Sequence, residues 1–377
     1  MALEVLFRAD ASRLMGTGHV MRCLTLADAL VRKGWHCGFV CREQDGDMAD
    51  WIRARGHDLW LLPPFGTGGS SDSDYDGPPH AAWLGVPWLQ DAEETRAIAA
   101  EVAPRWLVVD HYALDARWER VLAPEVGSLM VIDDLADRDH DCQLLLDQNP
   151  GRVPERYSAW VPGACVTLTG TRYALLRDEF RQWRERRPPA SRTARVGRIL
   201  VTLGGSDPDN VTGKVLSALG DCQLPADTQV DVVMGPSASC LAAVHEQVRA
   251  LPFKATVTVG ATNMAERMAL SDLAIGAAGA TSWERCCLGL PSLVVAIADN
   301  QRGVLQTMTE QGLAEVADLP DLAQAVKSFV DSMQADPGRY FRMVERAAAA
   351  VDGLGADRVA DRMMAEHREA EHAARFD

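Results

Sequence analysis

The chain has 377 residues, and 47% of them are hydrophobic, which is enough for two domains of ordinary size with a sizeable core. The formal net charge of -15 argues against a nucleic-acid partner, because phosphate backbones are bound by clustered lysine and arginine. No apolar run approaches the roughly 18 residues of a membrane span, so we expect a cytoplasmic protein without one.

The first half of the chain alternates short apolar runs with helical periods. Strands are expected at residues 3–7, 37–41, 59–62, 106–109, 129–132 and 144–146. Helices are expected between several of these runs, for example at residues 20–33 and 95–102. Such alternation is typical of a parallel sheet covered by helices.

Residues 182–197 interrupt this alternation. The segment, QWRERRPPASRTARVG, is rich in Arg, Pro and Ser and poor in large apolar residues, which indicates a linker between domains. The alternation then restarts, with strands expected at residues 199–203, 230–234, 256–259, 273–275 and 292–297.

The expected fold is therefore an α/β protein with two Rossmann-like domains and parallel sheets. The N-terminal domain is expected at residues 1–181 and the C-terminal domain at residues 198–337, followed by a helical extension at residues 338–377. Two doubly wound halves would bind a ligand in the cleft between the carboxyl ends of their strands.

The segment FRADASRLMGTGHVMR, residues 7–22, joins the first expected strand to the first helix. Gly16 and Gly18 flank Thr17, and His19 follows at the expected start of the helix. Backbone N–H groups and the helix dipole make such a turn a natural anion site, where a histidine can face the group being cleaved or simply cap the helix. Met21 stands where the GxGxxG dinucleotide fingerprint needs its third glycine, so no dinucleotide cofactor is expected.

Two further loops in the second half suit phosphate contact. Gly279, Ala280, Thr281 and Ser282 follow the expected strand at residues 273–275 and begin a helix. Glu284 lies in the first turn of that helix, where its carboxylate could accept from both ribose hydroxyls or cap the helix.

The other loop, residues 204–210, follows the strand at residues 199–203. Gly204, Gly205 and Ser206 suit phosphate contact, whereas residues 207–210 could equally be a plain turn with an N-cap. Asn300 and Gln301 follow the last expected strand and supply amides for sugar hydroxyls. Asp110, His111 and Tyr112 end the strand at residues 106–109, so polar groups gather at strand ends in both halves. Nine cysteines occur without a CxxC pair, so we expect reduced thiols and no metal site.

The motifs RADAS, GTGHVMRC, VVDHY, VIDDLADR, LLLDQN, RYALLR, TLGGSDPDN, GATSWE and ADNQ occur in this order. Together they resemble the UDP-sugar hydrolases of the pseudaminic acid pathway, from about Val5 to Gln301. That family releases UDP from UDP-2,4-diacetamido-2,4,6-trideoxy-β-L-altropyranose. The resemblance implies the GT-B fold of the metal-independent glycosyltransferases, including the lipid II synthesising one.

The resemblance also implies roles for individual residues. His19 would activate water, and Tyr112 and Asn300 would line the sugar site. Gly16, Gly18 and Gln301 are further residues that we expect to bind the substrate. Glu284 would hold the ribose, and the residues from Gly279 to Ser282 would lie near the diphosphate or uridine. Ala278 departs from the expected second glycine beside Gly279. The expected partner is a UDP-sugar, with no cofactor, and a monomer is expected.

Other functions share much of this machinery. An inverting glycosyltransferase would use a UDP-sugar donor and replace water by a sugar hydroxyl, but the acidic balance weighs against a lipid acceptor. A UDP-sugar 2-epimerase would need more acidic residues around the sugar. A non-catalytic nucleotide-sugar binding protein would keep Glu284 and the glycine loops without needing His19.

Overall fold

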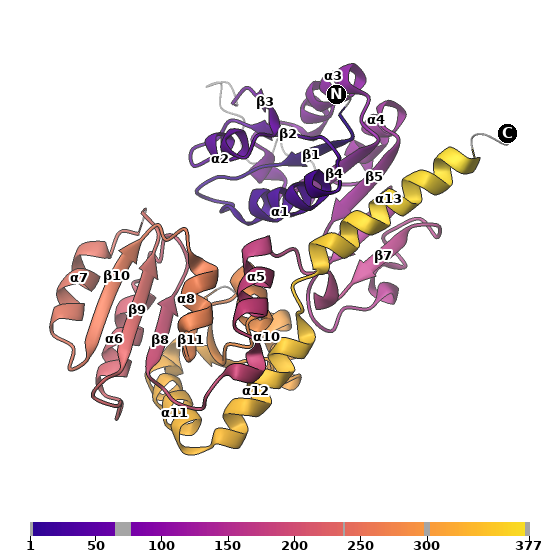
Figure 1. Ribbon diagram of the computed structural model, residues 1–377. Coiled ribbons are helices and arrows are strands. Elements are labelled where there is room, and N and C mark those ends of the chain that lie inside the picture. Colours follow the sequence, from indigo (N-terminus) through magenta and orange to yellow (C-terminus); the bar gives the residue numbers. More distant parts are fainter. Residues whose placement is uncertain (1–2, 65–76, 237, 298–301, 374–377) are drawn as a thin grey trace. The chain divides into compact units, whose positions relative to one another are not determined.

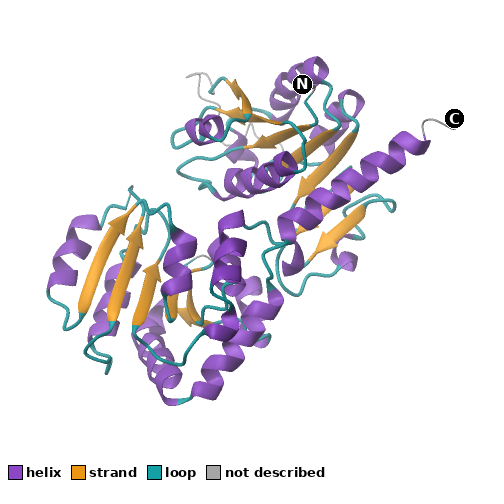
Figure 2. Cartoon of the chain, in the orientation of Figure 1, coloured by secondary structure: helices purple, strands orange, loops and turns teal. Residues whose placement is uncertain are grey.

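The computed structural model describes residues 3–64, 77–236, 238–297 and 302–373 of the chain. These form two compact units (Figure 1): residues Met1–Leu175 with Leu354–Asp377, and residues Leu176–Gly353. Each unit contains one sheet of parallel strands with helices packed around it (Figure 2). Among the described helices, none is both long and apolar enough to cross a membrane.

The sheet of the first unit has the strand order β3-β2-β1-β4-β5-β6-β7, and every neighbouring pair is parallel. Its strands are β1 (Val5–Ala9), β2 (Cys37–Arg42), β3 (Asp58–Leu62), β4 (Trp106–Asp110), β5 (Ser128–Ile132), β6 (Leu144–Asp147) and β7 (Val166–Thr169). Because the chain builds outward from β1 in one direction and from β4 in the other, the strand order reverses between them. Ligands of open α/β sheets bind at such a switch point.

The helices of the first unit are α1 (Gly18–Arg32), α2 (Ala49–Ala54), α3 (Trp88–Val102), α4 (Ala116–Leu122) and α13 (Gly355–Ala373). Short 3-10 helices lie at Ala81–Leu84, Ala123–Glu125, Pro154–Tyr157 and Thr171–Tyr173. Strands β1 and β4 are buried along their whole length, which is why they read as continuous apolar runs.

The sheet of the second unit has the order β10-β9-β8-β11-β12-β13 and is also parallel throughout. Its strands are β8 (Arg198–Thr202), β9 (Gln229–Met234), β10 (Lys254–Val259), β11 (Leu273–Ala277), β12 (Ser292–Ala296) and β13 (Glu315–Asp318). The strand order reverses between β8 and β11, so the second unit has a switch point of its own.

The helices of the second unit are α5 (Asp178–Arg186), α6 (Val211–Gly220), α7 (Leu241–Arg249), α8 (Met264–Leu270), α9 (Ala280–Cys287), α10 (Arg302–Glu310), α11 (Leu322–Ala335) and α12 (Pro337–Ala350). Two short 3-10 helices lie at Pro189–Ser191 and Leu319–Asp321. The two Rossmann-like halves expected from the sequence are thus present, and every expected strand forms within two residues of its expected ends.

The division between the units differs from the expected one. Residues 182–197 belong to the second unit rather than joining two domains. Arg192 within this segment is buried, and its guanidinium donates to the carbonyl oxygens of Met268, Ser271 and Leu288. A segment that satisfies three backbone carbonyls is part of the packed structure, although its composition is that of a linker.

The expected helical extension is divided between the units. Helix α12 belongs to the second unit, whereas α13 returns to the first. Val359, Ala360 and Met363 of α13 join the core beneath the sheet of the first unit. Arg32 at the end of α1 and Lys33, which caps it, form ion pairs with the carboxylates of Asp357 and Asp361 at 3.1 and 2.7 Å. Helix α13 therefore closes the first unit.

Gly355 begins α13 where the chain passes directly over Ala174, and a Cβ at Gly355 would collide with the backbone of Ala174. We expect Gly355→Ala to lower the unfolding free energy of the first unit by about 1–3 kcal/mol, the usual cost of overpacking. Calorimetric unfolding measures this change. Gly163→Ala is the matched control because a Cβ there meets open space. Equal melting of the two variants would contradict the packing of α13.

Candidate functional site

The C-terminal end of β4 in the first unit carries a buried carboxylate, Asp110, that binds two side chains of α1. The Nδ1 atom of His19 lies 2.6 Å from the Oδ1 atom of Asp110. Arg22 donates from Nε and Nη2 to the two oxygens of the same carboxylate, at 2.5 and 2.6 Å. His19 and Arg22 are three residues apart and so share one helix face. The switch point between β1 and β4 thus holds a His19–Asp110–Arg22 triad.

The hydrogen bond to Asp110 selects the tautomer of a neutral His19 ring. Burial alone would raise the pKa of Asp110, but the charges and hydrogen bonds of Arg22 and His19 hold that pKa well below its usual range. An ionised carboxylate only accepts, so the Nδ1 atom of His19 donates. In the neutral imidazole, the Nε2 atom then keeps its lone pair and can accept a proton.

Tyr112 lies beside this triad. Its ring meets the ring of His19 edge-on, with 4.6 Å between the centroids. Its hydroxyl donates to Oδ1 of Asp134 at 2.6 Å, and Arg22 donates to Oδ2 of the same carboxylate at 3.2 Å. Burial and the charge of Asp134 raise the pKa of Tyr112, so the phenol stays a donor. The structure therefore brings together His19 and Tyr112, two of the residues expected at the site.

The glycines of the GTGH turn differ in their roles. Gly16 has a φ of +80°, and its N–H closes a tight turn onto the carbonyl of Ser12. Only glycine adopts this conformation without strain. Gly18, the first residue of α1, has an ordinary φ, and a Cβ there would meet nothing within 4 Å. The packing of the described residues therefore does not require glycine at position 18.

Acidic residues of the RADAS and VIDDLADR motifs, which lie near the triad, form buried ion pairs that hold the fold together. Arg8 of the RADAS motif forms ion pairs with Asp10 and Asp91, and all three side chains are fully buried. Asp133 pairs with Arg138 at 2.7 Å, whereas the adjacent Asp134 faces Tyr112 and Arg22. Of the DD pair, only Asp134 therefore belongs to the site.

Asp147 supports this edge of the sheet from the end of β6. It accepts hydrogen bonds from the Tyr157 hydroxyl and the N–H of Asn149, each at 3.0 Å. Burial raises the pKa of Asp147 to about 6. This carboxylate therefore holds the loop that follows β6, and the Tyr157 hydroxyl, 3.0 Å from the carbonyl oxygen of Asp133, links that loop to the one after β5.

In the second unit, the loop of Gly204, Gly205 and Ser206 follows β8 and is exposed. Gly204 has a φ of +99°. The helix that follows is capped internally: the carboxylate of Asp207 accepts the N–H groups of Val211 and Thr212 at 2.8 and 2.9 Å. The N-terminus of α6 is thus occupied by the protein's own anion.

Helix α9 on the other side of the switch point begins differently. Its N-cap residue is Gly279, with a φ of +120°, and no side chain caps the helix. Gly279 and Ala280 are exposed, Thr281 is half-buried and Ser282 is buried. The first turn contains no acidic residue. The N–H of Ser282 already donates to the carbonyl of Gly279 at 2.9 Å, so the N–H groups before it and the helix dipole are what an anion could use.

Glu284 lies one turn further along α9. One oxygen of its carboxylate accepts from Arg177 at 3.2 Å, whereas Oε2 is buried and has no hydrogen-bond partner in the described part of the chain. Burial raises the pKa of Glu284. Its pairing with Arg177 shows that Glu284 does not cap α9. The free buried oxygen is an acceptor that a hydroxyl group could satisfy.

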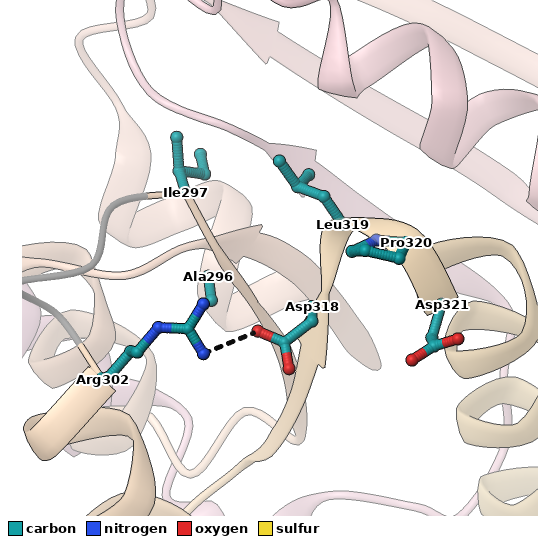
Figure 3. A pocket seen from close by; sticks show the side chains of 7 residues that line it. All are labelled: Ala296, Ile297, Arg302, Asp318, Leu319, Pro320 and Asp321. Atoms are coloured by element: carbon teal, nitrogen blue, oxygen red, sulfur yellow. Dashed lines mark ion pairs between the residues drawn. The ribbon is translucent and has the colours of Figure 1, made fainter.

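Asn300 and Gln301 lie outside the described residues. A pocket of about 530 Å³ lies beside the following residue, Arg302, at the ends of β12 and β13 (Figure 3). Arg302 reaches Asp318 across it at 3.7 Å. The lining residues are Ala296, Ile297, Arg302, Asp318, Leu319, Pro320 and Asp321.

Within the described ranges, no group of three or more His, Cys, Asp or Glu side chains is placed to hold a metal.

Sequence reasoning missed the pairing of His19 with Asp110 and the part of Arg22 in holding it. Asp110 was expected only as a polar residue at a strand end. One signal was present in the sequence: Arg22 stands three residues after His19, so a helix places both on one face. The pairing of β1 with β4, which brings Asp110 to them, appears only in the structure.

Comparison with known proteins extends these observations. The Glycosyltransferase family 28 C-terminal domain matches residues 198–359. The UDP-2,4-diacetamido-2,4,6-trideoxy-beta-L-altropyranose hydrolase of Campylobacter jejuni is 26% identical over 217 residues, which are 58% of this chain and 66% of that protein. The spore coat polysaccharide biosynthesis protein SpsG of Bacillus subtilis is 31% identical over 42% of this chain and 46% of its own length. The chain thus spans less than two thirds of these relatives.

Solved structures identify the fold. MurG from Acinetobacter baumannii superposes with a TM-score of 0.67 at 13% identity, covering 96% of this chain and 99% of that one. The UDP-GlcNAc 2-epimerase of Neisseria meningitidis gives a TM-score of 0.62 at 10% identity, covering 97% and 100%. The chain therefore has the GT-B fold with two parallel sheets, carries a region that matches the family 28 glycosyltransferases, and is similar in sequence to a UDP-sugar hydrolase, as its motifs indicated.

Proposed function

We propose that this protein hydrolyses a UDP-linked 2,4-diacetamido-2,4,6-trideoxy sugar at the anomeric carbon, releasing UDP and the free sugar. The observation that carries the proposal is the His19–Asp110–Arg22 triad at the switch point of the first sheet. The similarity to the Campylobacter jejuni hydrolase supports this choice of substrate. The reaction needs the UDP-sugar and water, and no cofactor.

His19 is the proposed general base. Its Nε2 atom removes a proton from water as the water oxygen forms a bond to the anomeric carbon. The bond between that carbon and the β-phosphate oxygen breaks, and its electron pair leaves with UDP. The proton remains on His19, whose imidazolium is stabilised by the buried charge of Asp110. Attack opposite the leaving group inverts the anomeric configuration.

The second unit is proposed to bind the leaving group. The uncapped start of α9, from Gly279 to Ser282, offers N–H and O–H donors to the diphosphate. Gly204, Gly205 and Ser206 are proposed to lie near the diphosphate at the same switch point. The unpaired oxygen of Glu284 accepts from a ribose hydroxyl. Tyr112, Asn300 and Gln301 are proposed to contact the sugar.

A second candidate function is an inverting glycosyltransferase with a UDP-sugar donor. The match to the family 28 glycosyltransferase domain favours it. His19 would then deprotonate an acceptor hydroxyl instead of water. UDP release by the purified protein without any acceptor separates hydrolysis from transfer, and UDP-sugar binding without turnover would indicate a binding protein.

We expect His19→Asn to lower turnover by roughly 10²–10⁴-fold, the usual contribution of a general base, with UDP affinity nearly unchanged. Asparagine keeps a polar side chain but cannot accept the proton. Initial rates of UDP release and calorimetric titration of UDP measure the two effects. His57→Asn is the matched control, since His57 is a buried histidine of the same unit that lies beside Asp28. Near-normal turnover of folded His19→Asn would remove His19 from the reaction.

Gly18→Ala tests whether substrate approaches the start of α1. No atom of the described residues lies within 4 Å of the added methyl group, so the variant should be as stable as the parent protein. We expect turnover to fall at least tenfold because the methyl group occupies the space that the sugar needs beside His19. Unchanged turnover would place the substrate elsewhere. The melting temperature of the variant serves as its internal control.

Glu284→Gln tests ribose recognition. The amide keeps the volume of the side chain but loses the charged acceptor, which costs on the order of 1–3 kcal/mol of UDP binding. The parent protein should prefer UDP to 2′-deoxy-UDP, and the variant should bind the two nucleotides more nearly alike. Glu246→Gln, at an exposed position of α7, should change neither affinity. A full preference for UDP in Glu284→Gln would show that this carboxylate does not contact the ribose.

A further inference from the structure

Arg285 is a buried cation without a carboxylate partner. Its side chain is 1% exposed, and in the described part of the chain no carboxylate lies within ion-pair distance of it. Glu284, its neighbour in sequence, pairs with Arg177 instead. A buried charge is costly unless it is paired, and burial lowers the pKa of Arg285 to about 10.

Other buried arginines of this chain are compensated. Arg8, Arg22, Arg42 and Arg138 each reach at least one carboxylate. Arg192 has no carboxylate, but its Nε, Nη1 and Nη2 atoms all donate to backbone carbonyls. The Nε atom of Arg285, in contrast, is buried without a hydrogen-bond partner. Arg285 is therefore compensated neither by an opposite charge nor by a full set of acceptors.

The guanidinium of Arg285 turns back toward the start of its own helix. Nη2 donates to the carbonyl of Ala277 at 2.9 Å and to the hydroxyl oxygen of Ser282 at 3.0 Å. Nη1 lies 3.4 Å from the hydroxyl oxygen of Thr281. These partners are all at the N-terminal end of α9, where the helix dipole is positive and disfavours a second positive charge.

Gly276 makes this placement possible. A Cβ at Gly276 would lie 2.5 Å from Nη1 of Arg285 and 2.9 Å from the carbonyl oxygen of Thr202. In the structure this glycine makes room for the guanidinium. Because Gly276 has no side chain, the positive charge of Arg285 lies close to the turn that contains the exposed residues Gly279 and Ala280.

The hydrogen bonds of Arg285 also decide what the two hydroxyls can do. An arginine N–H only donates, so the oxygens of Thr281 and Ser282 act as acceptors toward Arg285. The proton of each hydroxyl then remains available to donate. An anion at the start of α9 would receive these donors and would supply the negative charge that Arg285 lacks.

We propose that Arg285 is a positioning residue for the diphosphate of the nucleotide, directing the Thr281 and Ser282 hydroxyls toward it and serving as its buried counter-charge. This inference rests on the proposed function, because it takes UDP as the anion. Arg285 does not contact the diphosphate directly. Its contribution is specific for the diphosphate and absent for the nucleoside.

The test compares the affinities of UDP and uridine, measured by calorimetry with uridine determined by displacement. Arg285→Met removes the charge at similar length. We expect it to lower UDP affinity at least tenfold while uridine affinity stays within twofold. Arg192→Met is the matched control, a buried arginine of the same unit that donates to the backbone carbonyls of Met268, Ser271 and Leu288. It should leave the UDP-to-uridine affinity ratio unchanged.

Arg285→Lys provides a second variant should the methionine variant fail to fold. A lysine keeps the charge but cannot hold two hydroxyls in a fixed fork, so the affinity ratio should fall at least threefold. An unchanged ratio in both folded variants, or an equal loss of UDP and uridine binding, would overturn the role of Arg285. Absence of UDP binding by the parent protein would instead overturn the proposed function itself.

Discussion

The carboxylate of Asp110 is held away from water between the imidazole of His19 and the guanidinium of Arg22. It is ionised because Arg22 supplies a fixed positive charge at hydrogen-bond distance. Its charge in turn selects the proton on Nδ1 of His19 and leaves Nε2 as the acceptor. Removing the carboxylate would leave Arg22 buried with only Asp134, a loss of the kind that costs about 3–5 kcal/mol.

This arrangement depends on one feature of the sheet, the direct pairing of β1 with β4. The pairing places the end of β4 under the start of α1, and the three-residue spacing of His19 and Arg22 places both on the same helix face. The second unit repeats the topology with β8 and β11 but gathers donors instead of titratable groups. There the N-terminus of α6 is capped by Asp207, whereas no side chain caps α9. The guanidinium of Arg285 instead folds back toward the start of α9 and donates to the carbonyl of Ala277. The same topology thus gathers titratable side chains in one unit, where we propose the base, and hydrogen-bond donors in the other, where we propose the anion site.

The sequence predicted the strands that are fully buried, because runs such as VLFRA and WLVVD have no other environment in a protein of this size. It did not predict β7 and β13. Both have four residues and are partly exposed, so neither shows a clear apolar period. The sequence predicted a helix at α13. The helical pattern does not indicate which domain the apolar face of this helix packs against.

The site was predicted in the same uneven way. His19, Tyr112 and the turn from Gly279 to Ser282 follow from motif and strand-end position. The partners of Asp110 and Arg285 do not, because they depend on side chains that meet across strands or fold back along a helix. Arg285 carries no motif signal at all, and its importance appears only from its burial and its incomplete set of partners.

The most direct test of the account is hydrolysis of UDP-2,4-diacetamido-2,4,6-trideoxy-β-L-altropyranose by the purified protein in ¹⁸O-labelled water, without any acceptor. Mass spectrometry of the released UDP locates the broken bond, and early proton NMR spectra give the first anomer of the sugar. Attack of water on the anomeric carbon predicts UDP free of ¹⁸O and an inverted first anomer. UDP that carries ¹⁸O would show attack at phosphorus, and absence of UDP release without an acceptor would contradict hydrolysis.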